Sequence, residues 1–103
     1  TQHADRRVAD RALPFGIRSE TVDGNDPVAA WHAVDRAMRY VRRERKPYLL
    51  EALVSRLHGH SSSSGAQRVW DEPDAVALFE QKLLDAGAID AEQVRVLWDE
   101  ARQ

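Results

Sequence analysis

The chain has 103 residues, and its 15 lysine and arginine residues against 17 aspartate and glutamate residues give a formal net charge of −2. This length allows one domain at most, and the near-balanced charge provides no global field that would attract nucleic acid or an anionic membrane. The chain contains no cysteine, which excludes disulfides, thiolate nucleophiles and thiolate-bound zinc within these residues.

Membrane and export signals are also absent from these residues. No apolar stretch approaches the roughly 20 residues of a membrane-spanning helix, and residues 1–11 are too polar for a signal peptide. The chain does not begin with Met, so we expect the natural start to have been processed, trimmed or lost.

The first part of the chain predicts a short helix and an extended segment. Residues 4–13 suit a helix that ends at Pro14 and Gly16. Residues 17–23 then form a short link or strand, and Gly24-Asn25 is a turn signal. The helix side chains expected to face inward are Val8, Ala12 and Phe15.

A strong helix is predicted to open at Asp26-Pro27. Asn25 or Asp26 can accept bonds from the free N–H groups, and Pro27 suits the first helical position. The basic residues of 39–46 complement the dipole at the helix end, and Pro47 is expected to stop the helix. Its apolar stripe is Trp31, Val34, Met38 and Val41, with Ala30, Ala33 and Ala37 beside it.

Residues 48–54 predict a strand that is apolar on both faces except at Glu51. This pattern is typical of a central, doubly covered and usually parallel strand. With the extended part of 17–23, expected at Thr21-Val22, and the helix between them, it is predicted to form a right-handed βαβ unit. One side of strand 48–54 has nothing in this chain to pair with, so we expect these residues to end a larger domain or to dock onto another chain.

Two amphipathic helices are predicted after the loop. Gly87 is the expected C-cap of the first, and Asp90 with Gln93 resembles a capping box that opens the second. Their aromatic residues, like Trp31, are expected to be core or interface anchors. The two stripes are Val76, Phe79, Leu83 and Ala86, and then Val94, Leu97, Trp98 and Ala101.

The most informative stretch is residues 54–65, where the apolar strand enters a loop with two histidines and the four serines 61–64. Loops that leave buried strands carry chemistry in α/β proteins. His60 can donate to an anion or accept a proton, and Arg56 can bind a phosphate or carboxylate in a two-pronged grip. The pattern alone also allows His60 to be a solvated loop histidine and Arg56 to form an ordinary surface ion pair.

Other polar clusters give weaker signals. His58 and His60 could share a metal, but zinc needs three or four ligands and no third lies nearby in sequence. Residues 23–26 resemble part of a calcium loop but lack its closing glutamate, so a turn and helix cap explain them better. The basic residues of 39–46 lack interleaved aromatics, which favours a solvated helix end. We predict no metal ligand, no nucleic acid and no membrane partner.

The order and spacing of four motifs along the chain are specific: Phe-Gly-Ile (15–17), Val-Asp-Gly-Asn-Asp (22–26), Pro-Tyr-Leu-Leu-Glu-Ala (47–52) and Ser-Arg-Leu-His-Gly-His-Ser (55–61). Together they resemble the thiamine-diphosphate-dependent 2-oxo acid dehydrogenase family, specifically the C-terminal part of the alpha subunit, or alpha-like half, of the decarboxylating first component. The resemblance covers residues 12–65 closely and the last two helices more loosely.

The resemblance implies an α/β fold, the C-terminal portion of a doubly wound thiamine-diphosphate-binding fold in which two helices follow a βαβ unit. Residues 1–103 would be the C-terminal segment of an alpha-type domain. Its parts would be 1–25 (helix and short strand), 26–54 (helix and buried strand), 55–68 (active-site loop) and 69–103 (two helices).

The implied enzyme decarboxylates a 2-oxo acid, of pyruvate or branched-chain type, on thiamine diphosphate with Mg²⁺ and transfers the acyl group to lipoyl-lysine. The resemblance assigns His60 to catalysis and cofactor contact, Arg56 to ordering the loop and its contacts, and Ser61 to a phosphorylation site. The implied partners are a beta subunit or beta-like half, the lipoyl acyltransferase component and the remainder of the alpha domain. The implied location is the bacterial cytoplasm or the mitochondrial matrix.

The chain also departs from the family pattern. The Gly-Asp-Gly to Asn motif that holds magnesium and the diphosphate is absent, and its ligands are expected upstream of Thr1. Ser55 replaces the common tyrosine before the arginine, and residues 63–65 replace an aspartate that ties the loop down. Two alternatives therefore stay open: a non-catalytic interaction domain, and an acetoin-type thiamine-dependent dehydrogenase.

Overall fold

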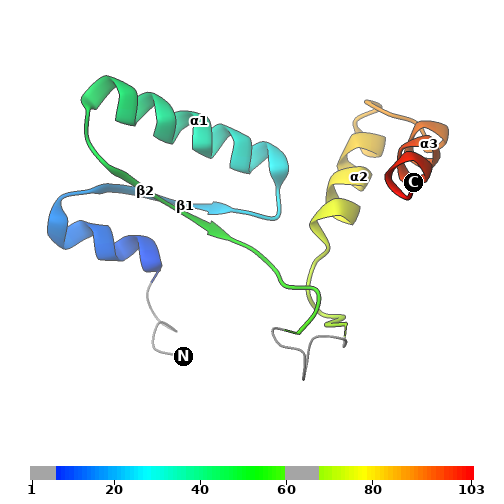
Figure 1. Ribbon diagram of the computed structural model, residues 1–103, viewed down its shortest axis with the longest axis horizontal. Helices are drawn as coiled ribbons and strands as arrows, with labels where there is room; N and C mark the ends of the chain where they lie inside the picture. Colours follow the sequence, from blue (N-terminus) through cyan, green and yellow to red (C-terminus); the bar gives the residue numbers. More distant parts are fainter. Residues whose placement is uncertain (1–6, 60–67) are drawn as a thin grey trace. The chain divides into compact units, whose positions relative to one another are not determined.

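The computed structural model describes residues 7–59 and 68–103. The chain divides into two compact units, Thr1–Arg56 and Leu57–Gln103. In the first unit, two helices pack on a pair of parallel strands, and in the second, two helices follow the predicted loop (Figure 1). No helix among the described residues is both long and apolar enough to cross a membrane.

The first unit is built around a parallel pair of strands, as the sequence predicts. The register runs from Arg18 opposite Tyr48 to Asp23 opposite Leu53. Helices η1 and α1 lie on opposite sides of this pair (Figure 1) and both contact its two strands. The elements are η1 (Val8–Phe15), β1 (Arg18–Asp23), α1 (Pro27–Glu44) and β2 (Tyr48–Leu53).

The predicted βαβ unit is therefore confirmed in its order and parallel pairing. Within residues 7–59 and 68–103, β2 pairs with β1 and with no other strand. The structure accordingly has the α/β character of the predicted fold, while the doubly wound sheet remains a prediction.

The first helix differs from its prediction. Helix η1 is a 3-10 helix that includes Pro14 and ends where Gly16 takes a left-handed φ of 65°. Ala9 and Ala12 are buried because the three-residue period of a 3-10 helix aligns them on one face. Val8 and Phe15, which we expected to face inward, are 46% and 78% exposed.

Helix α1 begins as predicted. The Asp26 carboxylate accepts bonds from the N–H groups of Val28 and Ala29, and Pro27 is the first helical residue. The helix ends at Glu44, before Pro47 is reached, because Arg45 adopts a left-handed φ of 55°. A stop at Pro47 would have let the helix run to Lys46, so the prediction is wrong and the helix ends two residues earlier.

The apolar stripe predicted for α1 does not face the strands. Ala33 is completely buried, whereas Trp31 is 66% exposed and Val34 is 51% exposed. Small side chains let a helix approach a sheet closely, so the alanine face packs inward and the larger side chains form a second apolar face. Helices that are apolar on more than one face are typical of the interior of larger proteins.

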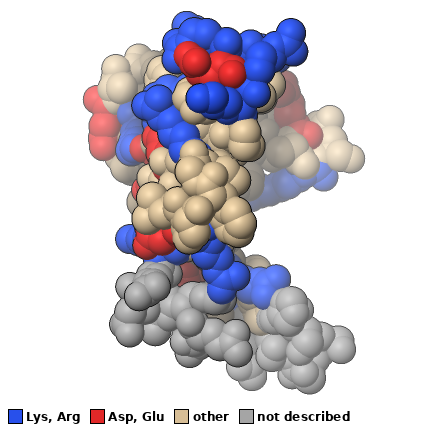
Figure 2. All heavy atoms as spheres, turned by 90° about the vertical axis from the view of Figure 1, so that its left-hand side faces the viewer, with Lys and Arg blue, Asp and Glu red and all other residues tan. Residues whose placement is uncertain are grey.

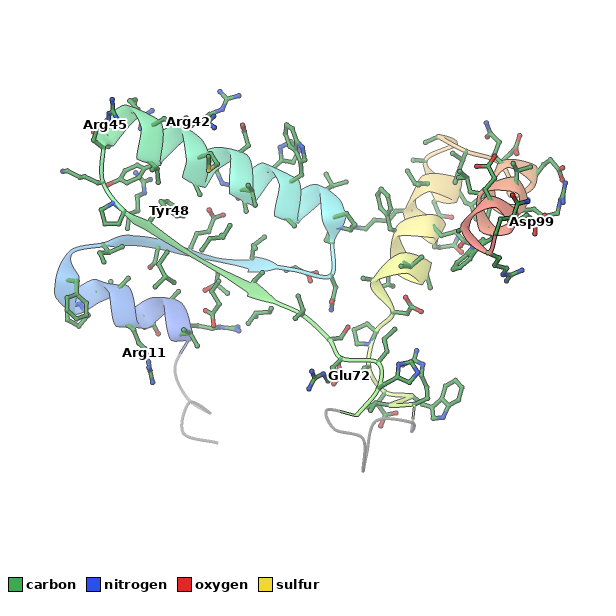
Figure 3. The ribbon with its side chains drawn as sticks, in the orientation of Figure 1. Arg11, Arg42, Arg45, Tyr48, Glu72 and Asp99 are labelled. Carbon is green, nitrogen blue, oxygen red and sulfur yellow. The ribbon has the colours of Figure 1, made fainter. Side chains whose placement is uncertain are left out.

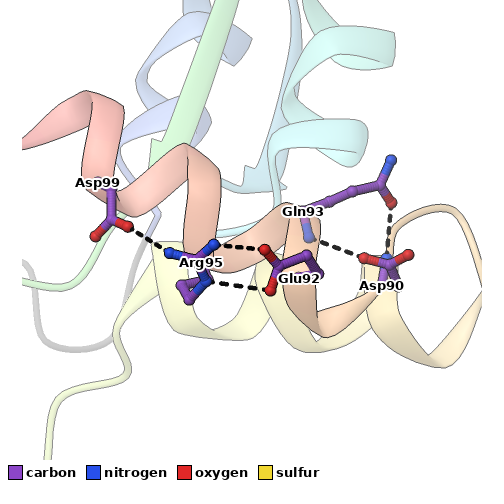
Figure 4. A network of polar contacts seen from close by, with 5 residues as sticks. All are labelled: Asp90, Glu92, Gln93, Arg95 and Asp99. Atoms are coloured by element: carbon purple, nitrogen blue, oxygen red, sulfur yellow. Dashed lines mark hydrogen bonds and ion pairs between the residues drawn. The ribbon is translucent and has the colours of Figure 1, made fainter.

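The second unit contains α2 (Ala75–Asp85) and α3 (Ala91–Ala101). The predicted capping box is confirmed, since Asp90 and Gln93 each accept a bond from the other's backbone N–H (Figure 4). Gly87 takes a left-handed φ of 70° one residue after the C-cap Ala86, which is the usual glycine position at a helix end. Arg95 bridges Glu92 and Asp99 along the exposed side of α3 (Figure 4).

The predicted stripes of α2 and α3 face a common apolar cavity with a volume of about 310 Å³. The Trp98 indole N–H donates to the Glu80 carboxylate at 2.9 Å, so the tryptophan is anchored at its polar end. Seven of the eight predicted stripe residues line this cavity, and Ala86 does not. The lining residues are Val76, Phe79, Glu80, Leu83, Ile89, Val94, Leu97, Trp98 and Ala101.

Candidate active site

The carboxyl ends of β1 and β2 lie at the same edge of the sheet because the strands are parallel. Strand β1 runs into the turn at residues 23–26, and β2 runs into residues 54–56. The register places Asp23 opposite Leu53, so the turn after β1 lies beside the segment that leads to Arg56. Ligands of open α/β sheets bind at this edge.

Asn25 joins the two strand exits. Its side-chain oxygen accepts a bond from the Ser55 N–H at 3.0 Å and another from the Ser55 hydroxyl at 3.2 Å. Asn25 is itself fixed, because its own N–H donates to the Asp23 carboxylate at 2.9 Å. These bonds hold the residue immediately before Arg56.

Ser55 has a defined role in this arrangement. A hydroxyl on this short side chain reaches Asn25 directly, and the residue is partly buried. The sequence predicted a turn at Gly24-Asn25 and a helix cap at Asn25 or Asp26. It gave Ser55 as part of the 55–61 motif and as a departure from the family pattern, but it did not pair Asn25 with Ser55. An Asx residue after one strand and a hydroxyl residue after its parallel neighbour were the signal that could have paired them.

Gly24 allows the turn to approach β2. Its N–H donates to the Leu53 carbonyl at 2.8 Å. A Cβ at this position would lie 2.9 Å from that carbonyl oxygen and 2.6 Å from Cγ1 of Val54. A side chain at position 24 would therefore force the turn away from the strand, so the close approach requires glycine.

The carboxylates of this turn are engaged by the backbone. Asp23 accepts from Asn25, and Asp26 accepts from the first N–H groups of α1. These contacts support a turn and helix cap over a calcium loop. Among residues 7–59 and 68–103, no group of three or more His, Cys, Asp or Glu side chains is placed to hold a metal ion.

The single acidic residue of β2 connects that strand to η1. The Glu51 carboxylate accepts bonds from the N–H groups of Val8 at 3.0 Å and Ala9 at 3.2 Å, and from the Thr21 hydroxyl at 3.0 Å. Desolvation raises the pKa of Glu51, but the bonds from Ala9, Thr21 and Val8 outweigh it and lower that pKa overall. Glu51 therefore caps η1, whose own N-cap residue Arg7 makes no side-chain cap bond.

In the second unit, the two ends of the predicted loop are joined. His58 and Arg68 form an isolated antiparallel bridge. The Leu57 carbonyl accepts from the Val69 N–H at 2.8 Å and from the Arg68 guanidinium at 3.2 Å. These contacts place residues 57–58 beside residues 68–69.

The predicted site residues are only partly within the described chain. Arg56 is described, is exposed and directly follows the residue held by Asn25. His58 is also exposed. His60 and Ser61 lie outside the described residues, so their predicted roles stay predictions, as does the role of Arg56.

Comparison with known proteins supplies the context for this site. The family model described as "Dehydrogenase E1 component" matches residues 1–103. The 2-oxoisovalerate dehydrogenase alpha subunit of mouse mitochondria is 34% identical over 99% of the chain and 25% of its own length. The corresponding Bacillus subtilis subunit is 31% identical over 96% of the chain and 32% of its own length.

A further relative carries a different substrate in its name. The pyruvate dehydrogenase E1 component alpha subunit of Rhizobium meliloti is 30% identical over 96% of the chain and 31% of its own length. No solved structure matches the chain. The chain thus spans about a quarter to a third of the length of these curated relatives.

The chain belongs to the dehydrogenase E1 component family. Within that family its relatives are alpha subunits of 2-oxo acid dehydrogenases. The predicted resemblance to an alpha-type segment of such an enzyme is therefore confirmed.

Proposed function

We propose that this chain contributes the C-terminal part of the alpha side of a 2-oxo acid dehydrogenase. The whole enzyme would oxidatively decarboxylate a 2-oxo acid on thiamine diphosphate and transfer the acyl group to lipoyl-lysine. The observation that carries the proposal is the match of the E1 family model across the entire chain. This match favours the enzyme over a non-catalytic interaction domain.

The arrangement at the strand exits supports a role in positioning the loop. Asn25 holds Ser55 through two bonds, and the 55–61 segment contains the arginine and histidine of the family motif. In the proposal, Arg56 orders the loop and binds an anionic group, and His60 donates or accepts a proton at the reacting acid or contacts the diphosphate. Such proton transfer is the role for which histidine is suited near neutral pH.

Thiamine diphosphate fits the donor chemistry of this segment. Guanidinium and imidazole N–H groups are suitable donors to its diphosphate, and Arg56 follows the strand edge where α/β proteins bind such ligands. When bound, the cofactor supplies the electron sink for decarboxylation. The proposal assigns no Mg²⁺ ligand to this chain and expects those ligands upstream of Thr1.

Partners and location follow the family. The proposed partners are a beta subunit or beta-like half, the lipoyl acyltransferase component and the remainder of the alpha domain. The relatives include mitochondrial proteins and two bacterial ones, in agreement with the expected mitochondrial matrix or bacterial cytoplasm. Ser61 remains the proposed phosphorylation site of the loop, where added negative charge would oppose binding of an anionic cofactor and acid.

The experiment that tests the proposal is a decarboxylation assay of the natural protein that carries this chain, together with its beta partner. We expect turnover of 2-oxoisovalerate or pyruvate that requires thiamine diphosphate and Mg²⁺. Acetoin is the control substrate. Cofactor-dependent turnover of acetoin alone would indicate the acetoin-type enzyme, and no turnover of any of the three compounds would contradict the proposal.

A further inference from the structure

A basic pocket lies at the amino ends of the two strands, at the opposite end of the sheet from Asn25 and Ser55. Its volume is about 230 Å³. Four arginines and two tyrosines from three elements converge on it: Arg18 from β1, Arg36, Arg39, Tyr40 and Arg43 from α1, and Tyr48 from β2. We propose that this pocket binds a compact oligophosphate, such as pyrophosphate or the polyphosphate group of a small molecule.

The floor of the pocket is preorganised by aromatic and polar contacts. The rings of Tyr40 and Tyr48 lie 5.6 Å apart at a tilt of 60°, and the Arg18 guanidinium lies 5.2 Å from the centre of the Tyr40 ring. Glu20 accepts from the Tyr48 hydroxyl at 2.8 Å and pairs with Arg36. One carboxylate thus fixes one tyrosine and two guanidinium nitrogens of Arg36. This set shapes the pocket, and Arg18, Arg39 and Arg43 supply the donors for a ligand.

The charge around the pocket is unbalanced. Four arginines line the pocket, and Arg42, Arg45 and Lys46 add three cations at the same helix end outside its lining. With three carboxylates nearby, this end of the first unit has an excess of four positive charges, whereas the whole chain has a net charge of −2. Figure 2 shows basic side chains concentrated on this face. The cations are Arg18, Arg36, Arg39, Arg42, Arg43, Arg45 and Lys46, and the carboxylates are Glu20, Asp35 and Glu44.

The helix dipole explains only part of this concentration. Cations in the last turn of α1 complement its carboxyl end, as the sequence suggested. That effect falls off within one turn, however, and it cannot account for Arg18 on a neighbouring strand or Arg36 two turns earlier. Convergence of guanidinium groups from different elements on one cavity indicates a binding site rather than a solvated helix end.

The pocket favours phosphate over a peptide carboxylate. Two phosphate groups carry roughly three to four negative charges at neutral pH, which the four arginines of the lining can match when the exposed pairs of Arg39 and Arg43 open. Acidic side chains carry one charge each, so a peptide would have to bring several of them into a cavity of about 230 Å³ to supply the same charge. Guanidinium forks also match phosphate oxygens in a bidentate manner.

Two of the arginines are available to exchange partners. Arg39 pairs with Asp35 at 2.9 Å and Arg43 pairs with Glu44 at 2.8 Å, in both cases with a neighbour on α1 and with 70% or more of the arginine side chain exposed. Exposed pairs of this kind are weak and are screened by salt. A phosphate in the pocket would therefore replace these pairings at little cost.

The test is binding of inorganic pyrophosphate to the natural protein that carries this chain, measured by titration calorimetry with thiamine diphosphate and Mg²⁺ at saturation. The test variant is Arg39→Gln with Arg43→Gln. The matched control is Arg42→Gln with Lys46→Gln, which removes the same charge from the same helix end outside the pocket. Arg42 of the control variant points away from the strands, whereas the pocket residue Tyr48 lies between α1 and the strands (Figure 3).

We expect the pocket variant to bind pyrophosphate at least about tenfold more weakly than the parent, the equivalent of about one charge-assisted contact. The affinity of the control variant should stay close to that of the parent. If the pocket variant loses helical circular dichroism, Arg18→Gln provides the same comparison from β1. Equal weakening in the pocket variant and the control would overturn the proposal in favour of a diffuse basic surface. Absence of pyrophosphate binding would overturn it as well, and binding of an oligoglutamate peptide in its place would indicate a protein partner.

Discussion

At the scale of single residues, the turn between β1 and α1 controls how the second strand leaves the sheet. Asn25 holds Ser55, and Gly24 lets the turn contact the Leu53 carbonyl. Neither residue needs to touch a substrate for this purpose. Their effect on chemistry would act through the position of Arg56 and the residues that follow it.

Gly24→Ala tests the close approach. Its added Cβ would meet the Leu53 carbonyl oxygen at 2.9 Å, so the backbone must shift. We expect the free energy of unfolding to fall by about 1–3 kcal/mol, the usual cost of overpacking, as measured by denaturant titration of the natural protein.

The double variant Gly24→Ala with Val54→Ala separates the two clashes. Trimming Val54 removes the side-chain contact but leaves the carbonyl in place. Little recovery of stability is therefore expected. Full recovery would show that the backbone approach does not require glycine.

The residue scale also shows where sequence reasoning reached its limit. Caps were predictable, because Asp26 and the Asp90–Gln93 pair act through near neighbours in sequence. The contacts of Asn25 with Ser55 and of Glu51 with η1 span 30 or more residues. Pairings at that separation depend on strand register, which the local pattern does not fix.

At the scale of elements, periodicity predicted the helical and strand segments but not which of their faces point inward. The 3-10 geometry of η1 changed which residues face inward, and α1 presents Ala33 to the strands in place of the Trp31 stripe. Periodicity identifies an apolar face but does not tell which of two apolar faces a small domain buries. The basic pocket escaped prediction for a related reason, because Arg18 and Tyr48 reach it from strands.

The contact between β2 and η1 predicts a pH dependence. The hydrogen bonds to Glu51 hold its pKa below the ordinary value of 4.5. The stability that the ionised carboxylate gives the fold is therefore fully present above pH 4.5 and is lost as the pH falls through the lowered pKa. Glu51→Gln places an N–H₂ group against backbone N–H donors, so it should be less stable than the parent at pH 7.

The measurement is thermal unfolding of the parent and Glu51→Gln at a series of pH values. The gap between them should narrow as pH falls below 4.5, because the parent glutamate then takes up a proton. Glu72→Gln is the control, because it makes the same change in charge at a residue of the second unit. A gap at Glu51 that stays constant across the whole range would show that ionisation of Glu51 does not support η1.

At the scale of the whole molecule, the described chain exposes much apolar surface. Its buried hydrophobic residues are Ala9, Ala12 and Ala33, whereas large side chains such as Trp31 and Leu97 are more than half exposed. Large apolar side chains exposed on both units are typical of surfaces that other parts of a protein cover. This agrees with a chain that spans a quarter to a third of its relatives' length.

The isolated 103-residue chain should therefore be marginally stable or should self-associate. Sedimentation velocity over a range of concentrations, combined with thermal unfolding, measures both properties. Association that rises with concentration, or a broad transition, is the expected outcome. A monomer with one sharp, cooperative transition would argue against the view that its apolar faces need covering.

The most direct test of the central claim is the turnover of His60→Ala, compared with His58→Ala, in the natural enzyme with its beta partner. A positioned acid or base typically contributes about 10²–10⁴ in rate, so His60→Ala should lose turnover on that scale while its unfolding temperature stays near that of the parent. His58→Ala should be milder, since His60 occupies the position of the family motif. Turnover of His60→Ala within a few-fold of the parent, or equal losses in both variants, would contradict the assignment of this loop to the active site.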